Sequence, residues 1–539
     1  MGAGEGLAAG QVLDTLTSLI DKSVVIGEQI GDAVRFRMLE TIREFGIDRL
    51  AERRDVDEAR LRHATFFADL VSLQSRRLYD AQQLDAARVL DVEHDNILSA
   101  VRYLGDSEDA ARTMRMVLEL SWYWSLVGAH AEAWTWLGYA LAVPGEAAPG
   151  ARELARVVML MTRGMEDNTA FEEDMTLKAA ALQQELELLP DPDYALPQAV
   201  VLRAMLAYFA GSPEVAEQKR LAGVEHPDPW VRAVMLMLGA AMAENFGHVD
   251  VTRANVDTAF EEFTALGDRW GLATVVAMKA QLQTYDGDLE GAIASYAEAE
   301  EYLRALGAHS DEAFMAMRLA NLRLRLDDLD GARREIARFD ELEDASGFPQ
   351  ILANAGRGWI AVREGDMDRV AAIRDTMTAQ AESSRALGGA HGQALLGTMV
   401  ALLDVELGDL DAARKSVSAG YTAALATRDM PILAGNGTAT ARLALAYDRC
   451  EDAAELLGAA ARVRGIEDAT DPTIAELFAV LPTRLGEEAF AEAYERGWSL
   501  SQADAVKRLD PASLDVTEAE PLEADEVGGV EAPAQARRR

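Results

Sequence analysis

Apolar side chains recur at helical spacing along most of this chain, in segments separated by short turns that mostly carry Gly, Asp or Asn. The turns recur at nearly constant distance, 36 to 43 residues apart: Gly128, Asn168, Gly211, Gly247, Gly287, Asp327, Gly365, Gly408 and Arg449. A period of about 40 residues made of two helices is typical of an α-solenoid, in which each helix pair buries its apolar side against the next pair. The pattern therefore predicts an all-α superhelix.

Small residues stand at two fixed positions around these turns. Seven residues before the turn are Ala204, Ala240, Ala280, Ala320, Gly358 and Ala401, and five residues after it are Ala133, Ala216, Ala292, Ala332, Ala413 and Ala454, with Thr252 and Val370 as weaker matches. Only a small side chain lets one helix approach its neighbour closely. This arrangement resembles the tetratricopeptide repeat, in its longer-period form from bacterial regulators. The resemblance implies a tetratricopeptide-like solenoid, which we expect over residues 121–506.

The N-terminal residues follow a different pattern. Apolar positions at residues 11–22 predict a helix, and residues 24–26 and 34–38 predict two strands around a turn at 27–31. A further helix begins near Leu39, and its expected buried side is Ile42, Phe45, Leu50 and Leu61. Helix, hairpin and helix form the back half of a winged helix. We therefore expect a partial winged-helix joint at residues 1–62 and a helical adaptor at 63–120.

Several short segments carry a more specific resemblance. They are LTSLIDKSV (16–24), RFRMLETIREF (35–45), RHA (62–64), EHDNI (93–97), LGEEAF (485–490), GWSL (497–500) and AV (505–506). In this order they resemble the C-terminal part of LuxR-type and STAND-ATPase-related bacterial transcriptional regulators. The first two segments look like the joint between the ATPase and repeat regions of that family. The resemblance implies that the repeats bind an effector or a protein segment.

One part of that family pattern is missing. Members usually carry a nucleotide-binding ATPase domain before the joint, and often a DNA-binding helix-turn-helix domain at one end of the polypeptide. A phosphate-binding loop requires Gly-x-x-x-x-Gly-Lys-Ser/Thr, but Lys22-Ser23 and Lys415-Ser416 do not follow a glycine. We expect a regulator that has lost, or been separated from, its ATPase part. A native protein that includes an upstream ATPase remains an alternative.

The net charge and the cysteine count make some classes of function unfavourable. The net charge of −39, from 91 acidic and 52 basic side chains, disfavours nucleic acid as the main ligand because phosphates would be repelled. Arginines at 35, 37, 43, 49, 53 and 54 still make the first segment the most basic one. The single cysteine, Cys450, excludes an internal disulfide and fits a reducing cytoplasm.

The tryptophans, histidines and other candidate side chains give little sign of catalytic or metal chemistry. Trp122, Trp124, Trp134 and Trp136 surround Gly128, and we expect them to fill the core of the first repeat, with an aromatic ligand cage as the alternative. The segment 93–96 suits helix capping, and the seven histidines lack the pairing that zinc requires. No nucleophile with a paired base emerges. We expect neither a cofactor, a metal nor an enzymatic activity.

The inner face of the repeats is the best candidate for a binding surface. In tetratricopeptide arrays the side chains one and five positions after the small residue point inward. By that resemblance the inner face presents Gln281, Tyr285, Asn321, Arg325, Trp359, Arg363 and Glu406. Arg325 and Arg363 could receive a carboxylate or phosphate, and Tyr285 and Trp359 could supply apolar contact. The alternative is a solvated surface on which the arginines pair with acids such as Asp327 and Glu364.

The sequence also predicts the character of the C-terminal tail and of the first residues of the chain. Residues 507–539 combine prolines, many acids and three terminal arginines without apolar periodicity, which predicts a disordered tail. The first ten residues lack a secretory signal, and the longest apolar runs, of about 11 residues, are too short to cross a bilayer. We expect a cytoplasmic protein.

These observations favour a non-catalytic sensor or scaffold of a bacterial transcriptional regulator. It would bind a protein segment or small effector on the concave face of its repeats, and a change of superhelical curvature would reach the N-terminal joint. The first alternative is a transcription factor that contacts DNA through residues 23–54. The second is the sensor part of an ATP-dependent regulator.

Overall fold

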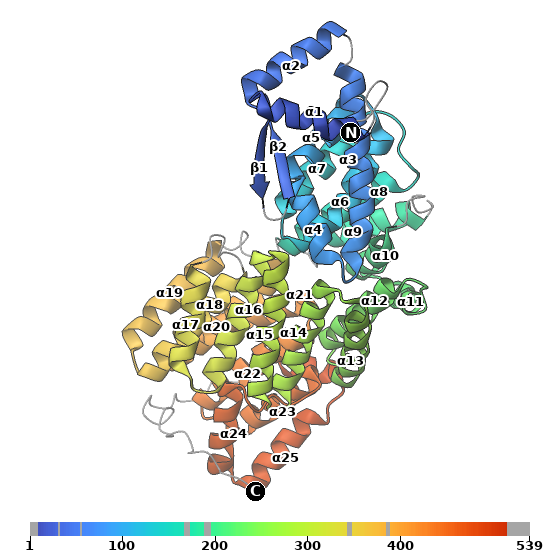
Figure 1. Ribbon diagram of the computed structural model, residues 1–539. Coiled ribbons are helices and arrows are strands. Elements are labelled where there is room, and N and C mark those ends of the chain that lie inside the picture. Colours follow the sequence, from blue (N-terminus) through green and yellow to red (C-terminus); the bar gives the residue numbers. More distant parts are fainter. Residues whose placement is uncertain are drawn as a thin grey trace.

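The computed structural model describes residues 9–30, 33–53, 56–166, 173–187, 196–341, 348–383 and 389–514. These residues form 26 α-helices and one two-stranded antiparallel sheet. Figure 1 shows two lobes, an N-terminal lobe of residues 9–224 and a repeat lobe of residues 229–514. The predicted all-α class and solenoid-like architecture are confirmed.

The N-terminal lobe contains α1 (Ala9–Asp21), β1 (Ile26–Ile30), β2 (Ala33–Arg37), α2 (Glu40–Arg53), α3 (Val56–Arg76), η1 (Arg77–Tyr79), α4 (Gln83–Val92), α5 (His94–Asp106), α6 (Ala110–Leu126), α7 (His130–Ala142), α8 (Ala151–Glu166), α9 (Glu173–Glu187), α10 (Pro197–Phe209) and α11 (Pro213–Val224). The predicted order of helix, hairpin and helix is present at its start. Strand β1 occupies residues that were predicted as the turn, because Gly27 pairs with Phe36 and Gln29 with Val34.

The predicted buried side of the second helix is wrong. Phe45, Leu50 and Leu61 are 58%, 37% and 40% exposed. Helix α2 projects from the lobe in Figure 1 and packs mainly on its neighbour α3. The apolar spacing found the helix, but of its predicted buried residues only Ile42 is half-buried, and Phe45 and Leu50 lie exposed. The predicted boundary between residues 62 and 63 falls inside α3, and that between 120 and 121 falls inside α6.

The repeat lobe contains α12 (Pro229–Asn245), α13 (Val249–Leu266), α14 (Arg269–Tyr285), α15 (Leu289–Leu306), α16 (His309–Arg325), α17 (Leu329–Asp340), α18 (Phe348–Glu364), α19 (Met367–Ser383), α20 (Gly389–Glu406), α21 (Leu410–Thr427), α22 (Met430–Ala446), α23 (Cys450–Arg464), α24 (Pro472–Leu485), α25 (Glu487–Trp498), α26 (Gln502–Arg508) and η3 (Pro511–Ser513). Consecutive helices from α12 to α23 pair as six hairpins. The even-numbered helix of each pair faces inward.

The predicted turns and small residues have clear physical roles. Gly247, Gly287, Gly365 and Gly408 adopt φ values of +71° to +79°, which glycine reaches without steric cost. The next residue often caps the following helix, as Asp288 does by accepting a hydrogen bond from the amide of Gly291. The predicted small residues are buried against neighbouring helices, for example Ala280 and Ala292 at 0% exposure.

Two predicted turns and part of the predicted tail do not match the structure or lie outside the described residues. At the turn predicted at Arg449, the residue with positive φ is Asp448, at +58°, and Arg449 occupies the N-cap position of α23 without a capping side-chain hydrogen bond. The turn predicted at Asn168 lies outside the described residues. Residues 507–514, predicted as part of a disordered tail, are structured, because Leu509 and Leu514 are 0% and 7% exposed and belong to the core around α22 and α23. The rest of the predicted tail lies outside the described residues.

Candidate functional site

A cavity of about 950 Å³ lies at the centre of the repeat lobe. Its wall is formed by the inner helices α12, α14, α16, α18, α20 and α22, by the end of α23 and by the segment 468–473. The volume is at the upper end of the range of about 300–1,000 Å³ that is usual for small-molecule sites. Six consecutive repeats therefore enclose one shared space.

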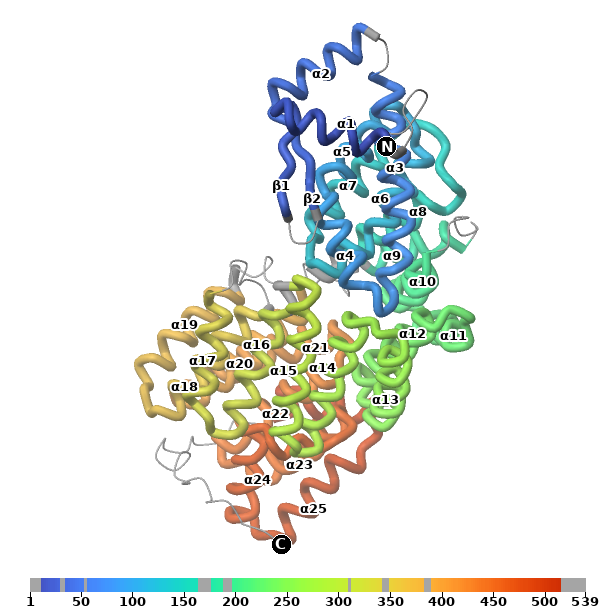
Figure 2. Tube along the Cα trace, viewed as in Figure 1, coloured from blue at the N-terminus to red at the C-terminus, as the bar shows by residue number. Residues whose placement is uncertain are grey.

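The cavity exists because the solenoid closes on itself. The ends of α12 and α23 meet so tightly that a Cβ atom on Gly247 would lie 2.4 Å from the carbonyl oxygen of Val463. The side chain of Gln502 donates a hydrogen bond of 2.7 Å to the carbonyl of Phe246. In Figure 2 the red C-terminal segments accordingly return to the green start of the repeat lobe. First and last repeats are thus in direct contact.

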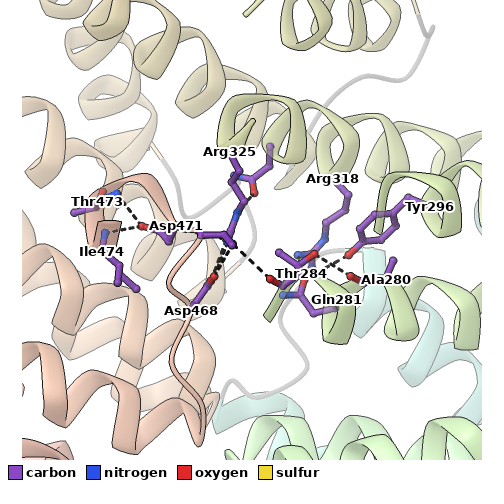
Figure 3. A network of polar contacts seen from close by, with 12 residues as sticks. Ala280, Gln281, Thr284, Tyr296, Arg318, Arg325, Asp468, Asp471, Thr473 and Ile474 are labelled. Atoms are coloured by element: carbon purple, nitrogen blue, oxygen red, sulfur yellow. Dashed lines mark hydrogen bonds and ion pairs between the residues drawn. The ribbon is translucent and has the colours of Figure 1, made fainter. Parts of the chain in front are cut away.

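Arg325 forms a second closing contact across the cavity, shown in Figure 3. Its Nη1 lies 2.6 Å from Oδ1 of Asp468 and 2.7 Å from Oγ1 of Thr470, and its Nη2 lies 3.0 Å from Oδ2 of Asp468. Burial opposes the charge of Arg325, but Asp468 and Asp471 outweigh it and raise the pKa of Arg325. Thr470 in turn donates to the carbonyl of Thr284 on α14, at 3.4 Å. This closing contact joins α14, α16 and the segment 468–471.

Several polar groups at the neighbouring end of the cavity have no such partner. Arg464 is 7% exposed and lines the cavity, yet it makes no hydrogen bond or ion pair with any described residue. The carboxylate of Glu244 and the hydroxyl of Tyr285 also line the cavity and have no hydrogen-bonding partner among the described residues. Burial raises the pKa of both Glu244 and Tyr285. Arg464 is buried, whereas Glu244 and Tyr285 are half-buried. Polar groups with so little access to solvent are normally paired, so these three are available to a ligand or ordered water in the cavity.

Arg318 on α16 lies in the same region. Its Nη1 donates to Oε1 of Gln281 at 3.0 Å, and its guanidinium lies 4.9 Å from the centre of the Phe314 ring. No carboxylate of the described residues comes within 4.0 Å of it, although the charges of Glu244 and Asp429 act on it at longer range. Arg318 is therefore held in position with its charge only partly compensated.

The adjoining wall, from α20 and the start of α22, carries His391 and Asp429. Asp429 accepts a hydrogen bond from the amide of Ile432 and so caps α22, and burial raises its pKa to about 6. Its Oδ2 lies 3.9 Å from Nε2 of His391, whose pKa is lowered by burial. Most of the remaining lining is apolar: Phe314, Met317, Leu324, Leu352, Trp359, Leu395, Met399, Leu402 and Ile432. The cavity combines a large apolar surface with a few charged groups.

The sequence-predicted face maps largely onto this cavity. Gln281, Tyr285, Asn321, Arg325, Trp359 and Arg363 all line it. Glu406 does not, and instead pairs with the buried Arg442 at 3.1 Å. Arg363 lies 3.8 Å from Asp327, as the alternative interpretation expected, whereas Arg325 pairs with Asp468 and not with a neighbour in sequence. That these residues bind a ligand stays a prediction.

Sequence reasoning missed the side of the cavity that closes it. Asp429 and Arg464 come from the start and the end of the last repeat, and Asp468 comes from the segment after it. The repeat pattern predicts neighbours within the stack but does not predict which distant repeats meet. The only local signals were Gly465, which lets α23 end close to another backbone, and the Asp468–Asp471 pair after it.

The junction of the two lobes is a buried polar and aromatic cluster. Asp268, which is fully buried, accepts hydrogen bonds from Nε2 of Gln83, from Nε1 of Trp230 and from the amide of Gly271. Gln83 on α4 also accepts from the amides of Arg269 and Trp270 at the start of α14. The ring of Trp122 lies 5.2 Å from that of Trp230 and 4.8 Å from that of Trp270. Residues from both lobes are thus tied to the first turns of α12 and α14.

The arginines of the first segment are mostly paired with acids. Arg35 pairs with Glu93, and Arg37, Arg43 and Arg49 pair with Glu28, Glu40 and Glu52. The side chains of residues 53 and 54 lie outside the described part.

Elsewhere in the described ranges, His, Cys, Asp and Glu gather in no group of three or more that could hold a metal ion. In the same ranges no helix is both long and apolar enough to cross a membrane.

Fold and cavity together define a class: an all-α helical-repeat protein whose solenoid closes around a central cavity. No protein-family model matches the chain. Three curated proteins, each named "Putative HTH-type transcriptional regulator", are similar to part of it: one from Mycobacterium bovis and two from strains of Mycobacterium tuberculosis. Each is 29% identical over 123 residues, which is 23% of this chain and 14% of the relative. The chain thus matches only a small part of these longer relatives.

Among solved structures, one similar chain is a Signal Transduction ATPase with Numerous Domains (STAND) protein with a tetratricopeptide repeat sensor, from Pyrococcus horikoshii. The match covers 89% of this chain and 60% of that chain, at 13% sequence identity and a TM-score of 0.34. At that TM-score the two shapes differ too much for the match to carry an argument about function.

Proposed function

We propose that this protein is a non-catalytic sensor of a bacterial transcriptional regulator, and that its repeat lobe binds an effector in the central cavity. The observation that carries the proposal is the cavity itself, which six repeats surround and which is lined by the buried Arg464 and the half-buried Glu244, both without partners among the described residues. The names of the mycobacterial relatives support a role in transcriptional regulation. A cytoplasmic location belongs to the same proposal.

The mechanism rests on two helices that reach both the cavity and the lobe junction. Helices α12 and α14 line the cavity with Glu244, Gln281 and Tyr285 near their C-terminal ends. Their N-terminal ends carry Trp230 and Trp270, which contact the N-terminal lobe. An effector that binds one curvature of the superhelix better than another would shift these helices and hence the junction. Such a shift requires different affinities for the two states.

A cavity-filling variant tests this proposal. Gly435 lines the cavity, and a Cβ atom there would meet nothing within 4 Å, so Gly435→Leu should fill space without disturbing α22. Gly138→Leu in α7 is the matched control, because Gly138 is also a helical glycine with open space but lies in the other lobe. The readout is a thermal-shift screen of the full chain with small metabolites and short peptides.

Binding at 100 times the dissociation constant should stabilise the protein by about 2.7 kcal/mol. We expect ligands that stabilise the parent and Gly138→Leu but not Gly435→Leu. Hydrogen exchange at residues 77–92 should change on binding if the junction responds. Ligands that stabilise Gly435→Leu as strongly as the parent would overturn the cavity as the effector site.

Direct DNA contact through the N-terminal helix and hairpin is a second candidate, which the words "HTH-type" in the relatives' names favour. The pairing of Arg35, Arg37, Arg43 and Arg49 with acids weakens it, because those charges are already compensated. It predicts duplex binding that weakens steeply with salt. A gel shift at low salt tests it, and absence of a shift would remove it. The sensor of an ATP-dependent switch with a separate ATPase would instead bind no DNA alone.

A further inference from the structure

The unpaired groups at the Tyr285 end of the cavity carry opposite charges. Arg464 presents a guanidinium and Glu244 a carboxylate, and both line the cavity. They are on adjoining backbones, since Gly247, one turn after Glu244, packs against the backbone of Val463 and Arg464. Nevertheless they do not pair with each other within 4.0 Å. A gap with one cationic and one anionic wall is thus preserved in a closely packed region.

We propose that the cavity binds a small zwitterion with apolar side chains, an amino acid or a short peptide. Its carboxylate lies on Arg464 and the hydroxyl of Tyr285, and its ammonium group lies on Glu244. This inference rests on the proposed effector function and specifies the ligand class. A planar guanidinium donates to both oxygens of a carboxylate, which makes Arg464 a suited partner. An ammonium group in turn donates hydrogen bonds to a carboxylate such as Glu244.

Arg325 and Asp468 do not compete for this ligand. The two side chains pair with each other in the closing contact, where they are only 9% and 6% exposed. Asp468 acts on Arg464 only at longer range, through its charge. The unpaired set is therefore Arg464, Glu244 and Tyr285, with Arg318 nearby and only partly compensated.

The rest of the cavity suits apolar side chains. Phe314, Met317, Leu352, Trp359 and Met399 form most of the wall beyond these polar groups. The volume of about 950 Å³ leaves room for more than one side chain. Closure of the solenoid by Arg325 and Asp468 favours a ligand that fits inside over a long segment that passes through. A di- or tripeptide should therefore bind more tightly than a single amino acid.

End-blocked peptides test the two charges separately. The probes are equimolar tripeptide pools built from Ala, Val, Leu and Phe, in free, N-acetylated and C-amidated form, with the four free amino acids as a size comparison. Binding to the full chain is measured by thermal shift and calorimetry. We expect the free pool to bind, and either blocked end to weaken binding about 10- to 100-fold, the value of one charge-assisted hydrogen bond.

Two variants assign the ends to residues. Arg464→Gln should bind the free and C-amidated pools equally, and Glu244→Gln should bind the free and N-acetylated pools equally. Arg414→Gln and Glu290→Gln, at exposed positions outside the cavity, are the controls and should keep the parent's discrimination. A variant that no longer distinguishes the free pool from one blocked pool has lost a contact with that end of the ligand. A variant that is merely less stable would still distinguish the two pools.

The outcomes distinguish this inference from the proposed function. If no pool and no amino acid binds, or if blocked ends make no difference in the parent, the zwitterion is overturned. If other compounds of the metabolite screen still stabilise the parent but not Gly435→Leu, the effector function stands with a different ligand class. If no compound distinguishes Gly435→Leu from the parent, the effector function itself fails.

Discussion

Arg325 on α16 and Asp468, 143 residues further along the chain, form a two-pronged ion pair that joins the third repeat of the lobe to the segment after the last one. Both side chains are almost completely buried, at 9% and 6% exposure. Burial disfavours the charge of Asp468, but Arg325 outweighs it and lowers the pKa of Asp468. The pair therefore stabilises the closed lobe above the ordinary pKa of an aspartate, and this stabilisation is lost as the pH falls through the lowered value.

We predict that Arg325→Ala and Asp468→Ala each lower the free energy of unfolding by about 3–5 kcal/mol, because each leaves a buried charge without its partner. The double variant should lose less than the sum, with a coupling of about 0.5–3 kcal/mol. Urea denaturation of the four proteins measures this cycle. Arg43→Ala, which breaks an exposed pair with Glu40, is the control and should cost no more than about 1 kcal/mol. Additive losses would show that the contact does not hold the lobe closed.

The repeat architecture could be predicted from the sequence because its causes are local. A glycine with positive φ, a capping aspartate and a small buried residue recur in each unit, as in Gly287, Asp288 and Ala292. Each of these acts within one helix pair, so its spacing is visible in the chain. The closure of the solenoid depends on small rotations that add up over six units. No residue pattern in the sequence shows how large the total rotation is. Pairing of Arg325 with Asp468 could therefore not be predicted, and Arg325 was expected to face solvent or a ligand.

The candidate site could also be predicted from the sequence only in part. The inner positions Gln281, Tyr285, Trp359 and Arg363 could be predicted, because the repeat fixes which side of each helix faces inward. The other polar groups that line the cavity, Arg464 and Asp429, could not, because they belong to the last repeat, which meets the first repeat only on closure. The exposed apolar side of α2 was predicted as buried because periodicity finds an apolar side but does not say whether anything covers it.

Two glycines at helix ends separate backbone strain from close packing. Gly307 and Gly465 both end a helix in the left-handed conformation, with φ of +74° and +84°. A Cβ atom on Gly307 meets nothing within 4 Å, whereas one on Gly465 would lie 1.8 Å from the carbonyl oxygen of Gly247. We predict that Gly307→Ala costs about 1–2 kcal/mol from the left-handed conformation alone. Gly465→Ala should cost clearly more and should separate α12 from α23. Equal losses of unfolding free energy in urea denaturation would contradict the close approach.

The buried cap of α22 should make stability depend on pH. Burial raises the pKa of Asp429 to about 6, against 3.8 for an ordinary aspartate, with His391 and Arg318 as the facing groups. The folded state thus holds this proton more tightly, so the contribution of Asp429 to stability falls as the pH rises from about 4 to about 6, by about 3 kcal/mol at most. Asp429→Asn keeps an acceptor for the amide of Ile432 but removes the charge.

We therefore predict that Asp429→Asn is more stable than the parent at pH 8 and that the difference shrinks towards pH 4. Asp409→Asn, at the exposed cap of α21, is the matched control and should show no such pH-dependent gain. Urea denaturation at a series of pH values provides the measurement. Parallel pH profiles of Asp429→Asn and the parent would show that Asp429 titrates normally in the folded state.

The lobe junction should depend on one amide side chain. Gln83 donates to Asp268 and accepts from the amides of Arg269 and Trp270, so Gln83→Leu removes the acceptor of the Arg269 amide and one of the hydrogen bonds of the buried Asp268. A buried unsatisfied group costs about 1–3 kcal/mol, and we predict a loss of unfolding free energy in that range. Because these groups lie between the lobes, hydrogen exchange should rise first at residues 77–92 and 268–272. Gln82→Leu, at an exposed neighbouring position, should leave both quantities unchanged. If Gln83→Leu lowered stability without faster exchange at those residues, α4 would not be the element that ties the cavity helices to the N-terminal lobe.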